Sequence, residues 1–126
     1  MIYKNFCKET FNERGELTDL EIKCEDTFNF AYDVVDAIAE AEPDRTALVW
    51  CDKNNEEHVF TFHDMSVLSN QAANVFRSHG IQKGDKVMLI LKRHYQYWYA
   101  LLGLHKLGAT AIPSTHMMTE RDIAYR

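Results

Sequence analysis

The sequence predicts an α/β fold, and one stretch in its second half carries most of that prediction. Residues 86–91 form an almost unbroken apolar run, which is typical of a strand buried on both faces. Residues 95–107 are apolar on nearly every side, as in a buried helix, and Gly108 follows where a helix C-terminal glycine belongs. Residues 109–113 form a second short strand. Strand, helix and strand within so few residues predict a βαβ unit with parallel strands and a right-handed crossover.

The chain is predicted to begin with an arm, residues 1–26, because charged side chains are dense there and apolar ones are sparse. Within this arm, residues 17–24 are interpreted as a short helix. The first long helix begins behind Thr27 or Asn29, either of which can accept a hydrogen bond from the first turn. Pro43 ends that helix, because proline disfavours the helical conformation of the residue before it.

A β-hairpin is predicted next. Residues 46–51 and 57–62 have the composition of paired strands. Residues 52–55 supply Asp and Asn between them, and these residues tolerate left-handed conformations and bond their own backbone.

Two capping boxes mark the starts of helices. Thr61 and Asp64 place one helix start at about residue 63, and Gly80 ends that helix. Thr119 and Asp122 mark another start, but only seven residues follow Thr119, too few for a stable isolated helix. Because the buried strand also needs neighbours, we expect the chain to be the front part of a larger α/β domain.

The helix that follows the hairpin is predicted to bury a stripe of Met65, Leu68, Ala72, Val75 and Phe76.

Composition limits the class of protein. With 126 residues, 46% of them hydrophobic, the chain resembles a globular domain in composition. No apolar run approaches the roughly 20 residues of a membrane-spanning helix, and the N-terminus lacks the apolar core of a secretory signal. Three scattered cysteines form neither a CxxC pair nor a disulfide framework, which favours a reducing, cytoplasmic location.

Charge is distributed unevenly along the chain. Residues 1–44 carry 12 acidic and 4 basic side chains, whereas residues 45–126 carry 7 acidic and 10 basic ones and all 6 histidines. We interpret the acidic part as a solvated surface. The basic residues form no dense stripe with interleaved aromatic residues, which argues against nucleic-acid binding.

None of the common phosphate-binding or nucleophile motifs occurs: there is no GxxxxGK[ST] loop, no GxGxxG turn after a strand and no GxSxG elbow. No His/Cys cluster has the spacing of a metal site. The basic residues 92–94 precede a helix whose N–H groups suit an anion, but we favour a plain surface position for them. The aromatic pair Trp98 and Tyr99 is expected in the core rather than against a cofactor.

Ser114, Thr115 and His116 are the best functional candidates on local grounds. They follow a strand at its carboxyl end, where open parallel sheets bind their ligands. An ordinary loop that leads to a helix cap is equally compatible with the pattern. Residue chemistry alone therefore predicts part of a ligand-binding α/β enzyme or module.

Three segments carry a resemblance to a known family. Residues 60–65 read aromatic-Thr-aromatic-x-Asp-Met, residues 84–91 begin Gly-Asp-Lys-Val, and residues 104–113 hold Lys-Leu-Gly-Ala before a strand. In this order and spacing they resemble the N-terminal portion of AMP-forming acyl-CoA synthetases, members of the adenylate-forming superfamily. The resemblance spans residues 28–126. The medium-chain acyl-CoA synthetase branch is indicated by further similarity at residues 28–33, 42–48, 115–117 and 122–126.

The resemblance implies a two-step reaction on a short- to medium-chain fatty acid. The carboxylate attacks ATP to give an acyl-adenylate and pyrophosphate, and the CoA thiol then displaces AMP, with Mg²⁺ and electrostatic stabilisation of the phosphates. By position, Thr115, His116 and Met117 resemble the loop that lines the family's CoA channel. The family's phosphate loop, metal motif, ribose-binding Asp, hinge and catalytic Lys have no counterpart in this sequence. No catalytic, cofactor-binding or metal residue is therefore assigned.

The chain divides, on this interpretation, into an arm, residues 1–26, and the N-terminal part of an AMP-binding domain, residues 27–126. The hypothesis is a fragment of an acyl-CoA ligase that is inactive alone; the full-length family uses ATP, Mg²⁺ and CoA, and none of them is expected to bind this fragment tightly. The alternative is a stand-alone, non-catalytic α/β module that binds an acyl or CoA group or a partner chain.

Overall fold

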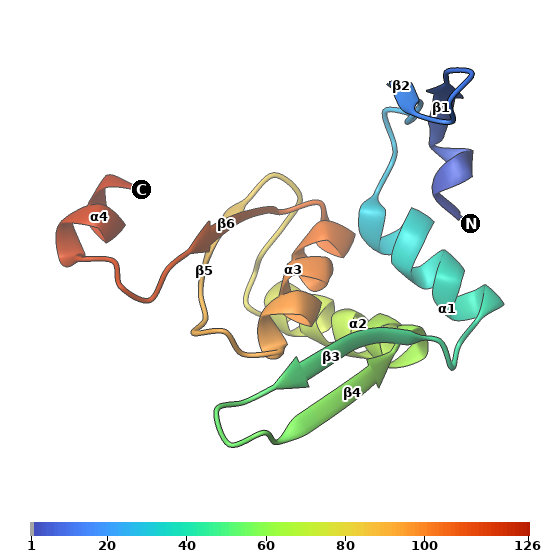
Figure 1. Ribbon diagram of the computed structural model, residues 1–126. Helices are drawn as coiled ribbons and strands as arrows, with labels where there is room; N and C mark the ends of the chain where they lie inside the picture. Colours follow the sequence, from blue (N-terminus) through green and yellow to red (C-terminus); the bar gives the residue numbers. More distant parts are fainter. Residues whose placement is uncertain (1) are drawn as a thin grey trace.

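The computed structural model describes residues 2–126, and it confirms the predicted α/β class. Three separate two-stranded sheets alternate with helices: two sheets are antiparallel hairpins and the third is parallel. Figure 1 shows the helices gathered at the centre, with the N-terminal hairpin and the last helix extending away from them. The elements are η1 (Ile2–Asn5), β1 (Cys7–Phe11), β2 (Leu17–Ile22), η2 (Ala31–Asp36), α1 (Ala37–Ala41), β3 (Thr46–Cys51), β4 (Glu57–Thr61), α2 (Phe62–Ser78), β5 (Lys86–Ile90), α3 (Gln96–Leu107), β6 (Thr110–Ser114) and α4 (Glu120–Tyr125).

The predicted βαβ unit is present. β5 and β6 pair in parallel from Lys86 opposite Thr110 to Ile90 opposite Ser114, with α3 between them in the chain. Gly108 ends α3 with a φ of 69°, the left-handed conformation that favours glycine. The expectation that β5 is buried on both faces is wrong for this chain, because Ile90 remains 40% exposed. Its neighbour Leu89 is buried because it packs against α3.

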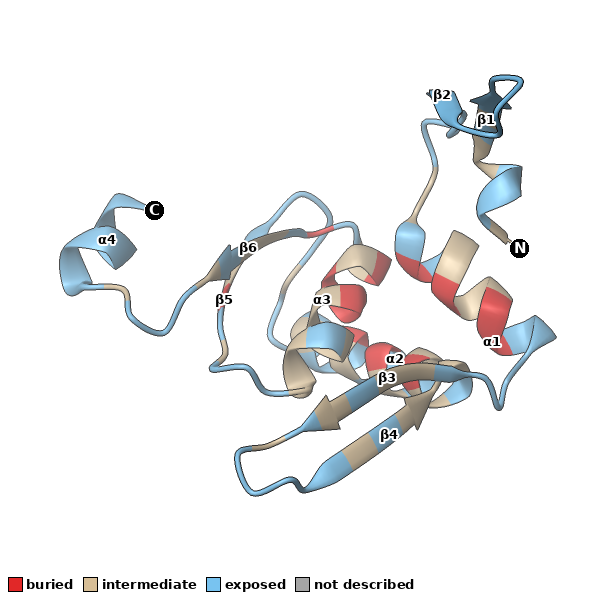
Figure 2. Ribbon diagram, viewed as in Figure 1, coloured by how far each residue is buried: buried red, intermediate tan, exposed pale blue. Residues whose placement is uncertain are grey.

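α2 and α3 pack closely, and this contact corrects the stripe predicted for α2. Met65 is buried as predicted, but Val75 is 56% exposed. Ser69, which is fully buried, and Ala73 take the inner positions instead. At this contact α3 presents Gly103, so the two backbones approach too closely for larger side chains. In Figure 2 the buried residues of the two helices lie at the centre of the molecule.

The first long helix is capped by Asn29, one of the two predicted residues. The Asn29 side-chain oxygen accepts from the Ala31 N–H at 3.0 Å, and its backbone N–H donates to the Asp33 carboxylate at 2.6 Å. The Asn29 amide also donates to the carbonyl of His105 at 2.7 Å, which joins this helix to α3. The helix starts with π geometry in η2, continues as α1 and ends at Ala41, before Pro43.

A buried lysine ties the helices together. The Lys106 side chain on α3 is only 1% exposed. Its ammonium group donates to the Asp36 carboxylate and to the Asn70 amide oxygen, each at 2.8 Å, and lies 3.4 Å from the Ser66 carbonyl. It also lies 5.5 Å from the centre of the Tyr32 ring. One cation therefore joins η2, α2 and α3.

The predicted hairpin and both capping boxes are confirmed. β3 and β4 pair antiparallel, and the Asp52 carboxylate closes their turn by accepting from the N–H groups of Asn54 and Glu56 at 2.7 and 2.8 Å. Thr61 caps α2: its hydroxyl accepts from the Asp64 N–H at 3.1 Å, while its own N–H donates to the Asp64 carboxylate at 2.8 Å. α4 begins with the same reciprocal pair of hydrogen bonds.

The short helix predicted for residues 17–24 is wrong. Residues 17–22 form β2, which pairs antiparallel with β1. The turn between them is built by Asn12, whose side-chain oxygen accepts from the N–H groups of Arg14 and Glu16 at 2.9 and 3.0 Å, and by Gly15 with a φ of 77°. A register shift next to Phe11 places Leu17 opposite it, so both apolar side chains point to one face of the hairpin.

Gly103→Ala is expected to lower the free energy of unfolding by about 1–3 kcal/mol, the usual cost of overpacking a tight contact. A Cβ at this position meets the Ala72 Cβ and the Ala73 nitrogen, each at 2.9 Å, and the nitrogen belongs to backbone that cannot turn aside. Urea unfolding measures the change, with Gln71→Ala on the exposed side of α2 as the control. A Gly103→Ala chain as stable as the control variant would show that the helices do not approach this closely.

The Asp64→Asn variant is expected to be less stable than the unsubstituted chain at pH 7, and this difference in stability should disappear in acid. Hydrogen bonds from the Thr61 backbone and hydroxyl hold the pKa of Asp64 below its ordinary value of 3.8. A carboxyl whose pKa is lowered by folding contributes stability above its unfolded pKa, and this contribution disappears as the pH falls through the folded pKa. Unfolding midpoints measured between pH 7 and pH 2.5 should therefore converge for the two chains. A constant difference across this range would contradict the assignment; Glu57→Gln serves as the control.

Candidate functional site

The carboxyl ends of the parallel strands bring two loops to one edge of the sheet. Ile90 and Ser114, the last residues of β5 and β6, lie directly opposite each other. The loop after β5 carries the basic residues 92–94, and the loop after β6 carries the candidate residues 114–117. This edge is where open parallel sheets present residues to a ligand.

The structure keeps the predicted site residues together in one exposed turn. The Thr115 hydroxyl accepts from the Met117 N–H at 3.3 Å, and the Thr115 carbonyl accepts from the Met118 N–H at 3.4 Å. Thr115 and His116 are exposed, and Met117 is 75% exposed. The Ser114 hydroxyl, in contrast, donates back to the Ile112 carbonyl at 3.4 Å. The side chains at 115–117 are therefore accessible to a ligand or to another part of a protein.

The neighbouring loop is held by a hydrogen bond that the sequence does not signal. Arg93 has a φ of 46°, in the left-handed region that few non-glycine residues adopt. Its carbonyl accepts from the Trp50 indole N–H at 2.7 Å. Lys92, Arg93 and His94 are all exposed, in agreement with the surface position that we favoured. Trp50 thus fixes the backbone of the loop that carries the three basic side chains.

An aromatic cluster extends this support. The Tyr95 ring at the start of α3 lies 5.3 Å from Trp50, 5.1 Å from His58 and 5.0 Å from Phe60, measured between ring centres. Aromatic pairs at these separations contribute beyond their buried area. The cluster fastens the β3–β4 hairpin to the loop at the sheet edge, and no short-range pattern in the sequence predicts it.

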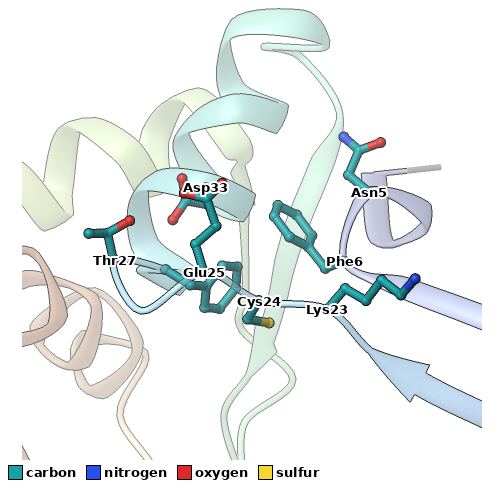
Figure 3. A pocket seen from close by; sticks show the side chains of 8 residues that line it. Asn5, Phe6, Lys23, Cys24, Glu25, Thr27 and Asp33 are labelled. Atoms are coloured by element: carbon teal, nitrogen blue, oxygen red, sulfur yellow. The ribbon is translucent and has the colours of Figure 1, made fainter.

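A cavity of about 700 Å³ lies elsewhere, between the arm and the first helix. Figure 3 shows its lining, where the Lys23 side chain points away from the Asp33 carboxylate. Lys23 lies 3.5 Å from Glu21, and Asp33 already accepts from the Asn29 N–H. The charged groups around this cavity do not converge, so we do not select it as the candidate site. Its other lining residues are Asn5, Phe6, Cys24, Glu25, Thr27 and Phe28.

The resemblance implies Mg²⁺, an ion that proteins usually hold through one or two carboxylates together with substrate phosphates. Within residues 2–126, no three side chains of His, Cys, Asp or Glu lie together in a way that could hold a metal ion. We therefore derive no step through a metal in this chain. The same residues include no helix that is both long and apolar enough to cross a membrane.

Comparison with known proteins decides the family. The profile of the family described as "AMP-binding enzyme" matches residues 35–126, which include the βαβ unit and the Lys106 contact. The chain belongs to the AMP-binding enzyme family. The resemblance inferred from residues 60–65, 84–91 and 104–113 is thereby confirmed.

Relatives of this chain include acyl-coenzyme A synthetases and ligases. It is 34% identical over 114 residues to the mitochondrial acyl-coenzyme A synthetase ACSM3 of Homo sapiens, covering 86% of the chain and 20% of the relative. It is 37% identical over 101 residues to 4-hydroxybutyrate–CoA ligase 1 of Metallosphaera sedula, covering 79% and 18%. The chain thus spans about a fifth of the length of these relatives.

A solved structure shows the same fold in an N-terminal domain. The inhibitor-bound N-terminal domain of FACL13 from Mycobacterium tuberculosis superposes with a TM-score of 0.68 and is 26% identical, covering 77% of this chain and 23% of that one. The fold is therefore that of the first part of an adenylate-forming enzyme.

Trp50→Phe is expected to loosen the loop after β5. The substitution keeps an aromatic ring in the cluster but removes the N–H that bonds the Arg93 carbonyl, at a cost of about 1 kcal/mol. Amide hydrogen exchange at residues 92–94 should accelerate several-fold. Trp98→Phe is the control and should leave these amides unchanged. Equal exchange in Trp50→Phe and the unsubstituted chain would show that the indole does not hold the loop.

Proposed function

We propose that this chain serves as the N-terminal part of an ATP-dependent, AMP-forming acyl-CoA ligase that acts on a short- to medium-chain carboxylic acid. The observation that carries the proposal is the family match over residues 35–126, together with relatives that are acyl-coenzyme A synthetases. The name of the Metallosphaera relative, a 4-hydroxybutyrate–CoA ligase, supports a short acid as substrate.

The reaction of such a ligase has two displacements. An oxygen of the acid's carboxylate bonds to the α-phosphorus of ATP while pyrophosphate leaves, and the CoA sulfur then bonds to the acyl carbon while AMP leaves and the thiol proton passes to solvent. Stabilising the phosphate charge is the main catalytic task in such a reaction. We assign this chain a positioning task instead: its helices hold the β5–β6 edge, and that edge presents residues 114–117.

Within this proposal, Thr115, His116 and Met117 line the channel through which CoA approaches. Their exposure and their place at the carboxyl end of β6 support this role. We also keep the cytoplasmic location as a prediction, which the three free thiols support; the ACSM3 relative, however, is named as mitochondrial.

A chimeric enzyme tests the proposal. Residues 35–126 would replace the matched segment of the Metallosphaera ligase, and two activities would be measured: ATP–pyrophosphate exchange with 4-hydroxybutyrate, and formation of the CoA thioester. We expect both activities within about tenfold of the parent, since a tenfold loss corresponds to only about 1.4 kcal/mol. The 126-residue chain alone should show no exchange. A folded chimera without exchange would contradict the proposal and would favour the non-catalytic module.

His116→Trp in this chimera tests the role of the loop. A larger side chain that narrows the CoA channel should lower thioester formation at least tenfold, about 1.4 kcal/mol, while pyrophosphate exchange stays within about twofold. His79→Trp, at the exposed end of α2, is the control for the added ring. If both activities fall together, the loop does not act on the CoA step alone.

A further inference from the structure

The strand β2 has a free edge. Within residues 2–126, β1 is the one strand that pairs with β2, and Figure 1 shows their hairpin extending away from the helices. Both strands precede residues 35–126, the segment that the family profile matches, so the family match assigns no contact to them. A two-stranded hairpin by itself is only marginally stable in water, and further strands stabilise it. The hairpin therefore lacks the neighbours that a stable sheet needs.

The backbone groups of Ile22 point to this free edge. The Lys23 N–H donates to the Phe6 carbonyl at 2.7 Å, toward β1. Since successive residues of an antiparallel strand direct their backbone groups to opposite sides, the N–H and carbonyl of Ile22 face away from β1. The Leu20 N–H agrees with this alternation, because the Asp19 side chain, and not β1, accepts its hydrogen bond at 3.0 Å. An edge with unpaired backbone groups is a template for another strand.

We propose that β2 pairs antiparallel with β2 of a second copy of this chain, with the two Ile22 residues opposite each other. These residues exchange two backbone hydrogen bonds, and the two hairpins become one four-stranded sheet. The two-fold axis passes between the two Ile22 residues, so every other contact occurs twice. Ile22 is 67% exposed in the single chain, and in the dimer the two side chains lie side by side, each next to Cys7 of its own hairpin. This contact is independent of the proposed ligase activity.

Charge complementarity favours this register. With Ile22 at the axis, Glu21 of each copy lies opposite Lys23 of the other, because these residues are the neighbours of Ile22 on either side. In the single chain the Glu21 and Lys23 side chains are more than half exposed and lie 3.5 Å apart. Lys8 of β1 lies across the hairpin from Glu21. In the dimer each Glu21 is therefore flanked by a lysine on both sides.

Neighbouring registers of β2 bring like charges together. Moving the axis by one residue opposes Glu21 or Lys23 to its own copy. Moving the axis to Leu20 opposes Asp19 to Glu21. Like charges directly opposite each other destabilise a pair of strands. With the axis at Ile22, the like charges Asp19 and Glu25 meet only at the outer ends, where Glu25 lies beyond the last residue of β2.

The outer edge of β1 is less suited to the same pairing. An axis at Lys8 or Glu9 opposes that side chain to its own copy, which again places like charges together. A register shift next to Phe11 also interrupts the ladder, and such irregularities twist an edge away from another strand. The edge of β2 is therefore the edge of this hairpin that best matches itself.

Charge reversal in matched variants tests this contact. Sedimentation of the 126-residue chain should show a monomer–dimer equilibrium with a dissociation constant on the order of 10–100 µM, since the interface is smaller than the standard size. Glu21→Lys and Lys23→Glu should each weaken dimerisation at least tenfold, because each sets like charges opposite one another. Glu13→Lys, in the exposed turn of the hairpin, is the control and should change the dissociation constant less than threefold.

An equimolar mixture of the Glu21→Lys and Lys23→Glu variants should recover dimers within about threefold of the unsubstituted chain. In the mixed pair the lysines of one variant face the glutamates of the other, so the repulsion of each separate variant is removed. This recovery also shows that both variants are folded. A chain that stays monomeric at about 1 mM overturns the inference, and so does a mixture that dimerises no better than the separate variants.

Disulfide cross-linking tests the register. Ile22→Cys and Thr18→Cys would be compared in a chain with Cys7, Cys24 and Cys51 replaced by serine. The Cα atoms of a hydrogen-bonded antiparallel pair lie about 5.5 Å apart, a separation that a disulfide can span. On mild oxidation, Ile22→Cys should form cross-linked dimers at least tenfold faster than Thr18→Cys, which lies farther from the axis on the same strand. Equal rates in a chain that dimerises would overturn the inference.

Discussion

The ammonium group of Lys106 is the contact on which the rest of this structure depends. It is almost completely withdrawn from water and is neutralised by Asp36 and hydrogen-bonded to Asn70. A buried charge of this kind is costly unless its partners are all in place. The three helical segments that supply these groups must therefore adopt one relative position. We regard Lys106 as the residue that gives the chain a single arrangement, rather than as a large net source of stability.

The arrangement of these helical segments also determines where the candidate site lies. Lys106 fixes the end of α3, and Gly103 fixes α3 against α2. In the chain, β5 precedes α3 and β6 follows it, so the place of α3 limits where both strands can lie. Gly108 turns the chain directly into β6, and β6 delivers residues 114–117 to the sheet edge. Residues of the family motifs therefore contribute to this arrangement. Thr61 caps α2, and Lys106 and Gly108 set the place of α3 and the start of β6.

Short-range patterns in the sequence correctly predict the features that depend on contacts between near neighbours in the chain. Thr61 with Asp64 and Thr119 with Asp122 form their capping boxes as predicted, because every partner lies within three residues. Gly108 adopts the conformation that only glycine reaches without cost. These features depend on backbone geometry and need no knowledge of the rest of the molecule.

The errors arose where distant segments decide the outcome. Val75, which belongs to the predicted stripe, is exposed, and Ser69, which does not, is buried where Gly103 lets α3 approach α2 closely. Trp98 is expected in the core, yet it remains 48% exposed. The hydrogen bond from Trp50 to the Arg93 carbonyl joins residues 43 positions apart, and helical or strand periodicity holds no information about such a pair. Residues 115–117 directly follow β6, as the sequence predicts, whereas their role in the CoA step stays a prediction.

The most direct test of this account is a double-mutant cycle between Asp36 and Lys106, with Asp36→Asn, Lys106→Met and both together, each measured by urea unfolding. The account predicts a coupling energy of about 2 kcal/mol or more, within the range found for buried charged partners. The double variant should lose much less stability than the sum of the single variants. A coupling energy within about 0.5 kcal/mol of zero would show that the two side chains act independently, and would contradict the place given to Lys106.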